Sequence, residues 1–256
     1  MARRDESTQA RLERDLAELK LPEIARNYRE VLDEAARKGS SMLEVLATLI
    51  GMEQTARQQR ALQRRLLEAR LPKPKTVTEY DFSFPKRIPK AAILRLFDCD
   101  FITRHGCAVM IGSTGTGKSH LLTALGYTAA ARGYSVRHTR VVDMINHLTT
   151  AQINGLLGKA LKTYVRPSLL LLDELGYLPI DKRGADLLFQ VVAARYETGS
   201  IVLTTNRPFR EWGALFDVDN TLATALIDRL MHHGEALVIQ GNSYRMKDKD
   251  PDSTSA

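Results

Sequence analysis

A glycine-rich segment that ends in lysine and serine is the part of this sequence whose residue types and spacing point most directly to chemistry. The segment Gly112-Ser-Thr-Gly-Thr-Gly-Lys-Ser119 fits the pattern G-x-x-x-x-G-K-[ST] and lies between a predicted strand and a predicted helix. Its glycines let the backbone turn N–H groups toward phosphate oxygens, at the positive end of the following helix. Lys118 would contact the β- and γ-phosphates of a nucleotide, and the Ser119 hydroxyl would bind Mg²⁺. The predicted nucleotide-binding residues are Gly112, Ser113, Thr114, Gly115, Thr116, Gly117, Lys118, Ser119 and His120.

An apolar run that ends in two carboxylates is the second candidate. Leu169 to Leu172 precede Asp173 and Glu174, about 55 residues after Lys118. A buried parallel strand delivers the residues at its carboxyl end to the ligand crevice. Asp173 is predicted to hold Mg²⁺ through water, and Glu174 to orient and polarise the water that attacks the γ-phosphate. For either carboxylate alone, a solvated strand end or a helix cap is the alternative.

A polar amide follows another apolar run. Asn206 comes directly after residues 201–205, and it can hydrogen-bond the attacking water or the γ-phosphate if that strand lies beside the Asp173 strand. The alternative is an asparagine that opens a turn before Arg207-Pro208.

The elements that would position these residues form an alternating pattern. Short apolar runs separated by helical segments predict a parallel sheet covered by helices on both faces, which is an α/β fold. The predicted strands are residues 107–111, 135–139, 169–172, 201–204 and 237–239. Residues 141–166 are long enough for two helices.

The residues before this pattern predict a small all-helical domain. Apolar side chains recur at three- and four-residue steps, with breaks at Pro22 and Gly39, and Ser41 with Glu44 has the spacing of a capping box. The predicted divisions are an N-terminal domain over 1–70, a linker over 71–90, a P-loop domain over 91–247 and a disordered tail over 248–256. We expect the linker aromatics Tyr80, Phe82 and Phe84 to clip the linker to the next domain, with contact to a bound base as an extra role.

Composition excludes several classes of protein. The chain has 256 residues, 44% of them hydrophobic and 26% charged, which is typical of a globular protein rather than a disordered or fibrous one. It has no apolar stretch near the ~18 residues of a membrane span and no signal-peptide core, so we expect a cytoplasmic protein without a membrane partner. Cys99 and Cys107 form no metal-binding or disulfide pattern and are expected to be small buried residues.

Positive charge is concentrated in one short segment. The formal net charge is +7, and residues 53–75 contain seven basic side chains against two acidic ones. Such a segment can bind DNA phosphates, although a solvated helix face is an equally good interpretation of any single arginine. The candidate DNA-binding residues are Arg57, Arg60, Arg64 and Arg65, together with Lys159, Lys162 and Arg166 in the region of the two predicted helices.

With these residues placed, the sequence resembles the AAA+ ATPases, in the clade of replication initiators and helicase loaders. More narrowly, it resembles the IstB-type transposition helper ATPases of bacterial insertion sequences, over nearly the whole chain from Leu19 to Arg245. The Gly-Tyr-Leu-Pro, Arg-Tyr-Glu and Leu-Met-His-His elements favour this branch over the DnaC-type helicase loaders. The motifs that carry the resemblance are 112–121, 172–179, 195–197, 204–206, 228–233 and 241–245.

The resemblance implies a role for each matching residue. Lys118 and Ser119 match the Walker A residues, Asp173 and Glu174 the Walker B pair, and Asn206 the sensor-1 position. Arg229 matches the arginine finger that reaches a neighbouring subunit's ATP, so that hydrolysis depends on assembly. An ion pair with Asp228 is the alternative for Arg229, and Arg195 is a weaker candidate for a second interface contact. Only 27 residues follow Arg229, too few for a full helical lid, so no sensor 2 is assigned.

The function implied is an ATP- and Mg²⁺-dependent ATPase that binds duplex DNA with little sequence preference. It would assemble as a homo-oligomer on DNA, select target DNA for a cognate transposase and stimulate that enzyme. A replicative helicase loader like DnaC is the first alternative. A nucleotide-gated adaptor, whose N-terminal helices bind a protein, is the second.

Overall fold

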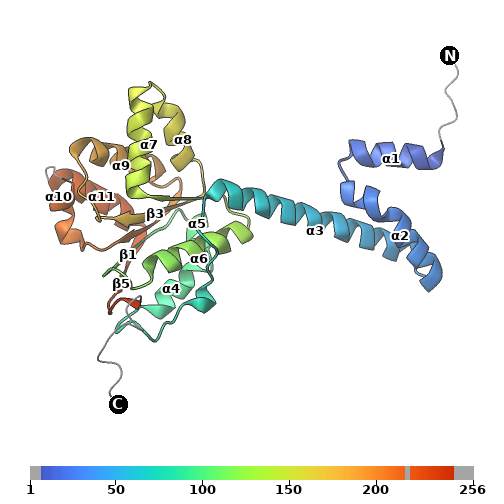
Figure 1. Cartoon of the computed structure of the whole chain (residues 1–256), viewed down its shortest axis with the longest axis horizontal. Helices are drawn as coiled ribbons and strands as arrows, with labels where there is room; N and C mark the ends of the chain where they lie inside the picture. The colour runs from blue at the N-terminus through green and yellow to red at the C-terminus, as the bar shows by residue number, and fades with distance from the viewer. Residues whose placement is uncertain (1–6, 217–219, 245–256) are drawn as a thin grey trace. The chain divides into compact units, whose positions relative to one another are not determined.

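The structure is a computed structural model that describes residues 7–216 and 220–244, and the chain divides into two compact units, residues 1–64 and 65–256 (Figure 1). The division falls inside the long helix α3 (Met42–Ala69), whereas the sequence predicts a boundary after residue 70. The predicted disordered tail, residues 248–256, lies outside the described residues, as does Arg245 of the last motif.

The first unit is helical, as predicted, and its helix ends follow local sequence signals. Its helices are α1 (Thr8–Glu18), α2 (Pro22–Lys38) and the first part of α3. Gly39 ends α2 in the left-handed conformation, with φ 67°. Ser41 and Glu44 form the predicted capping box, because the Glu44 N–H donates to Ser41 Oγ (3.3 Å) and the Ser41 N–H donates to Glu44 Oε2 (2.7 Å).

A five-stranded parallel sheet forms the centre of the second unit, in the order β2-β3-β4-β1-β5. All five predicted strands are present, and β5 begins three residues before its predicted start at Leu237. Every residue of β4 is buried, as is every residue of β3 except Glu174, which explains why these strands are continuous apolar runs. The strands are β1 (Cys107–Gly112), β2 (Val136–Arg140), β3 (Leu169–Leu175), β4 (Ser200–Thr205) and β5 (Gly234–Ile239).

Helices cover both faces of this sheet (Figure 1). On one face α6 packs against β2, β3 and β4, while α7, α9 and α11 pack on the other and contact one another in the order α7, α9, α11. The predicted pair of helices over residues 141–166 is confirmed as α7 and α8. The helices are α4 (Lys90–Leu96), α5 (Asp100–Thr103), α6 (Lys118–Ala131), α7 (Val141–Ile153), α8 (Leu157–Val165), α9 (Lys182–Arg195), α10 (Trp212–Leu215) and α11 (Asn220–His232), with 3₁₀ turns η1 (Val77–Glu79) and η2 (Phe209–Glu211).

The predicted linker, residues 71–90, belongs to the second unit and is fixed to it. Arg87 and Gln240 exchange backbone hydrogen bonds of 2.9 and 3.0 Å. The Tyr80 hydroxyl donates to the Thr116 carbonyl oxygen (2.8 Å), and the rings of Phe84 and Tyr244 meet edge to face at 5.0 Å. Tyr80 and Phe84 therefore fix the linker to the rest of the second unit, as the sequence predicts.

Both cysteines are free thiols that form no disulfide. Cys99 is buried and Cys107 is partly buried, and burial raises the pKa of both thiols. Among the described residues, no helix is both long and apolar enough to cross a membrane.

Candidate nucleotide-binding site

The glycine-rich loop connects β1 to α6, which is the strand–loop–helix context that the motif requires. Gly115 and Gly117 have φ angles of 84° and 83°, where side chains are strained. A Cβ atom on Gly115 would lie 2.0 Å from Ser243 Oγ, and one on Gly117 would lie 2.4 Å from Tyr80 Cε2. Two glycines of the motif are thus required by backbone conformation and by close neighbours at the same time.

Lys118 is buried at the start of α6 with its ammonium group inside the loop. Its Nζ donates to the carbonyl oxygens of Gly112 (2.7 Å) and Ser113 (2.8 Å). Burial lowers the pKa of Lys118 to about 8, although Asp173 opposes the shift. The desolvated cation is therefore held by neutral acceptors, and a phosphate oxygen would be a stronger partner for it.

The two carboxylates of β3 sit on an irregularity that the sequence does not show. The pairing of β3 with β4 shifts register between Leu172 and Leu175, and Glu174 has a φ of 64°. A bulge of this kind redirects side chains and is common next to active sites. The Glu174 N–H donates to Thr204 Oγ1 (3.0 Å), and the Thr204 hydroxyl donates in turn to Asp173 Oδ1. Thr204 lies in the motif 204–206, but sequence reasoning assigned it no role in the site.

The same Asp173 oxygen also meets the glycine-rich loop. Ser119 Oγ donates to Asp173 Oδ1 at 3.0 Å, which places the two predicted Mg²⁺ ligands side by side. Hydroxyl and carboxylate oxygens are the ligands that Mg²⁺ prefers. Ser119 and Asp173 therefore fit the binding of a magnesium ion together with a nucleotide.

Asn206 lies one residue beyond β4, beside the turn that follows the carboxylates. β4 and β3 pair with Thr205 opposite Leu175, and a Cβ atom on Gly176 would lie 3.2 Å from Asn206 Oδ1. That oxygen is buried and has no hydrogen-bond partner among the described residues. A buried acceptor without a donor suits a bound water or ligand, although Asn206 is not among the residues that line the cavity.

A cavity of about 490 Å³ connects these groups. Its phosphate side is lined by the loop and by Asp173 and Glu174, and its other side by the 72–85 segment and Tyr244. Tyr80 and Phe84 therefore both clip the linker and line the cavity, where they offer an aromatic surface to a base. His120 also lines this cavity, and its Nε2 lies 2.8 Å from the Thr76 carbonyl oxygen.

Arg229 lies outside this cavity. It is on α11, where its guanidinium stacks over the Phe189 ring at 4.7 Å and Nη1 donates to the Ala225 carbonyl oxygen (3.0 Å). No ion pair joins it to Asp228 within the part of the chain that the structure describes.

Arg195 is not an interface residue, contrary to the sequence expectation. It is 1% exposed, and its guanidinium donates to five backbone carbonyl oxygens at 2.7 to 3.1 Å. Burial lowers its pKa to about 10. Arg195 therefore ties the end of α8 to the starts of β3 and β4.

Three of the four candidate DNA-binding arginines of α3 form hydrogen bonds with other residues of the protein. Arg57 Nη2 donates to the Lys20 carbonyl oxygen (3.0 Å), and Arg60 Nη2 donates to the buried carboxylate of Glu53 (3.0 Å). In the second unit, Arg65 Nε donates to the Ala130 carbonyl oxygen (2.9 Å). Arg64 is exposed.

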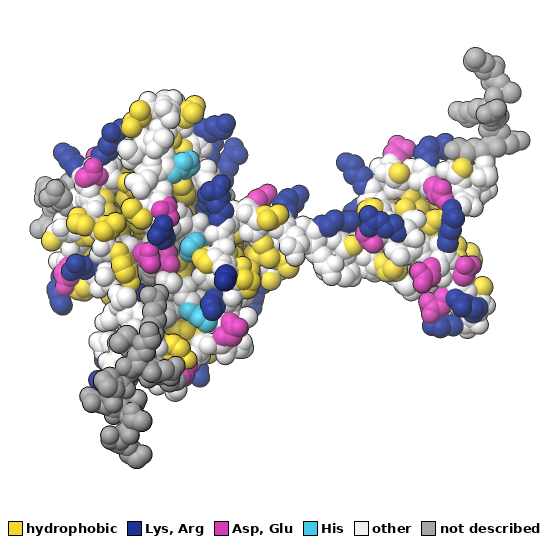
Figure 2. All heavy atoms as spheres, in the orientation of Figure 1, with side chains coloured by type: hydrophobic (Ala, Val, Ile, Leu, Met, Phe, Trp, Pro, Cys, Tyr) yellow, Lys and Arg dark blue, Asp and Glu magenta, His cyan; other side chains and the backbone are white. Residues whose placement is uncertain are grey.

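The candidates on α8 lie beside a groove that the sequence did not predict. Lys159, Lys162 and Arg166 are exposed, and a cavity of about 510 Å³ is lined by Arg70, Arg137, Lys162 and Arg166 against one carboxylate, Glu68. We call these four cations the basic groove. Figure 2 shows Lys and Arg side chains gathered beside α8.

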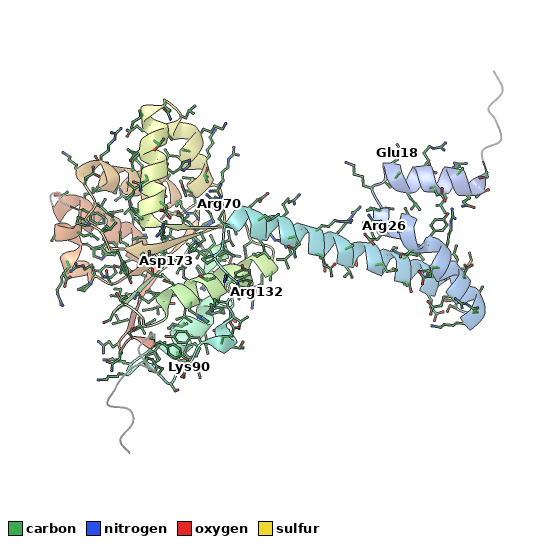
Figure 3. The ribbon with its side chains drawn as sticks, viewed as in Figure 1. Glu18, Arg26, Arg70, Lys90, Arg132 and Asp173 are labelled. Atoms are coloured by element: carbon green, nitrogen blue, oxygen red, sulfur yellow. The ribbon has the colours of Figure 1, made fainter. Side chains whose placement is uncertain are left out.

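Arg137 gives the basic groove a guanidinium whose hydrogen bonds are only partly satisfied, because Nη1 donates to the Glu68 carbonyl oxygen (3.3 Å) while Nε has no partner among the described residues. Burial and the nearby Arg70 lower the pKa of Arg137. A second cavity, lined by Arg70, Arg137 and Asp173, continues toward the nucleotide site; Figure 3 marks Arg70 and Asp173. Anionic ligands would relieve this crowding of like charges.

Comparison with known proteins identifies close relatives. Residues 14–251 match the sequence profile of a protein family that is described as IstB-like ATP binding protein. A protein named as an ATP-binding protein of insertion sequence IS5376 from Geobacillus stearothermophilus is 37% identical over 231 residues, which are 90% of this chain and 92% of that protein. One from insertion sequence IS21 of Pseudomonas aeruginosa is 37% identical over 234 residues, 91% of this chain and 88% of that protein.

Solved structures show the same fold. AMPPCP-bound DnaA from Aquifex aeolicus matches with a TM-score of 0.57 and 23% identity, over 70% of this chain and 54% of that chain. DnaI matches with a TM-score of 0.55 and 18% identity, over 70% of this chain and 92% of that chain. The chain thus spans just over half the length of the DnaA chain that it matches, and its second unit has the AAA+ P-loop fold.

Proposed function

The chain belongs to the family of IstB-like ATP binding proteins, and on that premise we propose that it is a Mg²⁺-dependent ATPase that acts on duplex DNA as a transposition helper. One observation carries the enzymatic part of this proposal. Lys118, the Ser119–Asp173 pair and Glu174 converge on a single cavity from two segments of the chain that lie about 55 positions apart.

The loop residues would bind the triphosphate. The backbone N–H groups from Gly115 to Ser119 would surround its oxygens at the positive end of α6, and Lys118 would exchange its two carbonyl partners for β- and γ-phosphate oxygens. Mg²⁺ held by Ser119, and by Asp173 through water, would neutralise phosphate charge.

Glu174 would then orient the attacking water and accept its proton. The bulge at the end of β3 directs this carboxylate into the cavity, and the Thr204 hydroxyl fixes its backbone. Asn206 Oδ1 would accept a hydrogen bond from the same water, which would satisfy its buried oxygen.

The experiment is Glu174→Gln, which keeps the shape of the side chain and removes the base. We expect ATP binding to persist, turnover to fall by ~10²-fold or more, and an ATP-loaded assembly to remain on DNA longer than the wild type. Glu235→Gln, on β5, is the matched control. Normal turnover, or faster release from DNA, would contradict the assignment.

We further propose that the protein assembles as a homo-oligomer in which Arg229 completes the neighbour's site. Arg229 cannot line its own cavity from its place on α11, whereas a guanidinium supplied by a second subunit would stabilise charge on the transferring phosphoryl group. ATP would then couple the subunit interface to DNA binding.

The basic groove supports duplex DNA as the ligand. Its cations surround a shallow surface, and no element among the described residues presents a recognition helix with base-reading side chains, so we expect phosphate contacts and little sequence preference. The relatives are named after insertion sequences. A cognate transposase, acting in the cytoplasm on the DNA so marked, is therefore the partner that we propose.

A replicative helicase loader is the second candidate, because the same nucleotide site would serve it. The two functions differ in the nucleic acid that the protein would bind, which is duplex DNA for a transposition helper and single-stranded DNA for a helicase loader. ATPase activity measured with duplex DNA, single-stranded DNA or neither would separate them, because a loader should respond to single strands. A transposase reading frame beside the gene, and failure to retain a hexameric helicase, would support the transposition role.

A further inference from the structure

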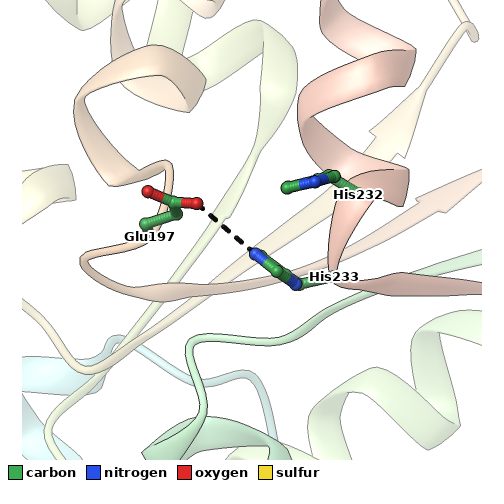
Figure 4. A group of neighbouring side chains, drawn as sticks. All are labelled: Glu197, His232 and His233. Carbon is green, nitrogen blue, oxygen red and sulfur yellow. Dashed lines mark hydrogen bonds and ion pairs between the residues drawn. The ribbon is translucent and has the colours of Figure 1, made fainter.

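Two consecutive histidines and a glutamate meet at one edge of the second unit, away from the nucleotide cavity (Figure 4). His232 ends α11 and His233 directly precedes β5, while Glu197 lies in the turn between α9 and β4. Both turns precede parallel strands, so they lie at the amino-terminal edge of the sheet. The glycine-rich loop, Asp173 and Glu174 lie at the carboxyl-terminal edge.

The separations of these side chains match those of metal ligands. One ligand atom from each residue lies within 4.8 Å of the others, and Glu197 Oε1 is 3.5 Å from His233 Nε2. Two ligands bound tetrahedrally at about 2.0–2.1 Å from a zinc ion are about 3.4 Å apart. The carboxylate and the imidazole therefore already have the spacing of two zinc ligands, although 3.5 Å is too long for a strong hydrogen bond.

A tyrosine orients the second imidazole. The Tyr196 hydroxyl and His232 Nδ1 are 2.7 Å apart, which leaves Nε2 of that ring available. Metal-binding histidines commonly use one ring nitrogen for the metal and the other for an outer hydrogen bond of this kind. The His232 and His233 rings lie 4.2 Å apart, tilted by 51°, so both face the same small space.

The backbone that carries the three side chains is held in place. The Cys107 N–H donates to the His233 carbonyl oxygen (3.1 Å), which fixes the residue at the start of β5. On the other side, the N–H groups of Thr198 and Gly199 donate to the Arg195 carbonyl oxygen (3.0 Å each) and close the turn around Glu197. Gly199 lies against the buried Arg195 side chain. The ligand positions would therefore be preorganised.

We propose that Glu197, His232 and His233 form a binding site for a divalent transition metal of the Zn²⁺ class. Two imidazole nitrogens and one carboxylate oxygen suit Zn²⁺, whereas Mg²⁺ and Ca²⁺ prefer oxygen ligands alone. Three protein ligands leave the fourth tetrahedral position to water. The ion would join the α9–β4 turn to the end of α11, one helical turn beyond Arg229.

Zinc titration of the full-length protein tests this proposal. The protein is freed of any polyhistidine tag and of bound metal with a chelator, and Zn²⁺ is then added in excess Mg²⁺ without nucleotide while calorimetry records binding. Excess Mg²⁺ occupies oxygen-only sites such as Ser119 and Asp173. We expect one Zn²⁺ per chain, and Co²⁺ in its place should give the visible absorption of a tetrahedral nitrogen–oxygen site.

Variants identify the ligands. Glu197→Gln, which preserves size, and His232→Ala and His233→Ala should each weaken Zn²⁺ binding by more than roughly 100-fold, and Tyr196→Phe by ~10-fold. His105→Ala is the matched control, because His105 lines the adjoining small cavity but lies outside the group of three. Circular dichroism of the metal-free variants checks that they fold.

Two results would overturn the proposal. One is the absence of stoichiometric Zn²⁺ binding to the wild type. The other is wild-type affinity in folded Glu197→Gln and His233→Ala, which would place any bound ion elsewhere.

Discussion

Ser119 and Asp173 are joined by a hydrogen bond of 3.0 Å between Oγ and Oδ1, across 54 positions of sequence. The Thr204 hydroxyl donates to the same oxygen and accepts the Glu174 N–H. One threonine on β4 therefore contacts both members of the carboxylate pair and sets how they face the glycine-rich loop.

Removal of this hydroxyl should impair hydrolysis more than binding. Thr204→Val keeps the shape of the buried side chain, frees Asp173 from one donor and leaves the Glu174 N–H without its acceptor. We expect turnover to fall by ~10- to 100-fold, corresponding to about 1.4–3 kcal/mol of transition-state stabilisation, while the ATP dissociation constant changes little. Steady-state ATPase assays with equilibrium nucleotide binding would measure both.

Thr205→Val is the control for this change. Its hydroxyl is on the same buried strand but accepts the Arg207 N–H and does not touch the carboxylates. Equal losses of turnover in the two variants would show that Thr204 acts only through the stability of β4.

Tyr80 should make stability depend on alkaline pH. Burial raises the pKa of Tyr80 from 10.0 to about 12, so the folded protein keeps the phenol proton between pH 10 and 12 while the unfolded chain loses it. The free energy of unfolding therefore falls as the pH rises through this interval. Tyr80→Phe should show a smaller fall in denaturant titrations at about pH 9.5 to 11, and an unchanged pH slope would mean that burial does not raise the pKa of this hydroxyl.

Arg229 should act on the neighbouring subunit. Arg229→Ala is expected to lower turnover by ~10³-fold while ATP binding to the isolated chain is retained. Mixing it with Lys118→Ala should restore part of the activity, because each variant supplies what the other lacks. Arg183→Ala, on the exposed face of α9, serves as the control, and a mixture that stays inactive would argue against a trans arginine.

The basic groove should determine how DNA binding responds to salt. Lys162→Glu combined with Arg166→Glu is expected to weaken duplex binding and to reduce the salt slope by ~1 for each phosphate that the protein no longer neutralises, without changing ATP affinity. Lys182→Glu with Arg183→Glu is the charge-matched control. An unchanged slope in the groove variant would instead favour Arg57, Arg60 and Arg64, the exposed members of the α3 set.

The sequence predicted the parts of the site that local patterns encode. The glycine-rich loop needs positive φ angles at Gly115 and Gly117, and buried strands need continuous apolar residues, so both leave a signature in neighbouring positions. The fold class and the placing of Asp173 at a strand end followed from those signatures.

Other features depend on contacts between distant segments and leave no such signature. The bulge at Glu174 arises from pairing with β4, and Arg195 is buried because carbonyl groups of residues 164–168 and of Ser200 converge on it. The sequence around an arginine near a helix end looks the same whether its side chain is buried against backbone carbonyl groups or exposed at a subunit interface. The basic groove likewise needs Arg70 and Arg137 from segments far apart in the chain.

The segment from Pro72 to Pro85 forms one wall of the nucleotide cavity, and this decides where the chain can be shortened. A fragment that begins at residue 91 would have every P-loop motif and still lack Tyr80 and Phe84, so its Gly117 loop would lose the ring that packs on it. A fragment that begins before Arg65 would keep that wall and the whole second unit. Weak nucleotide binding by the shorter fragment would therefore reflect a missing wall rather than a defective motif.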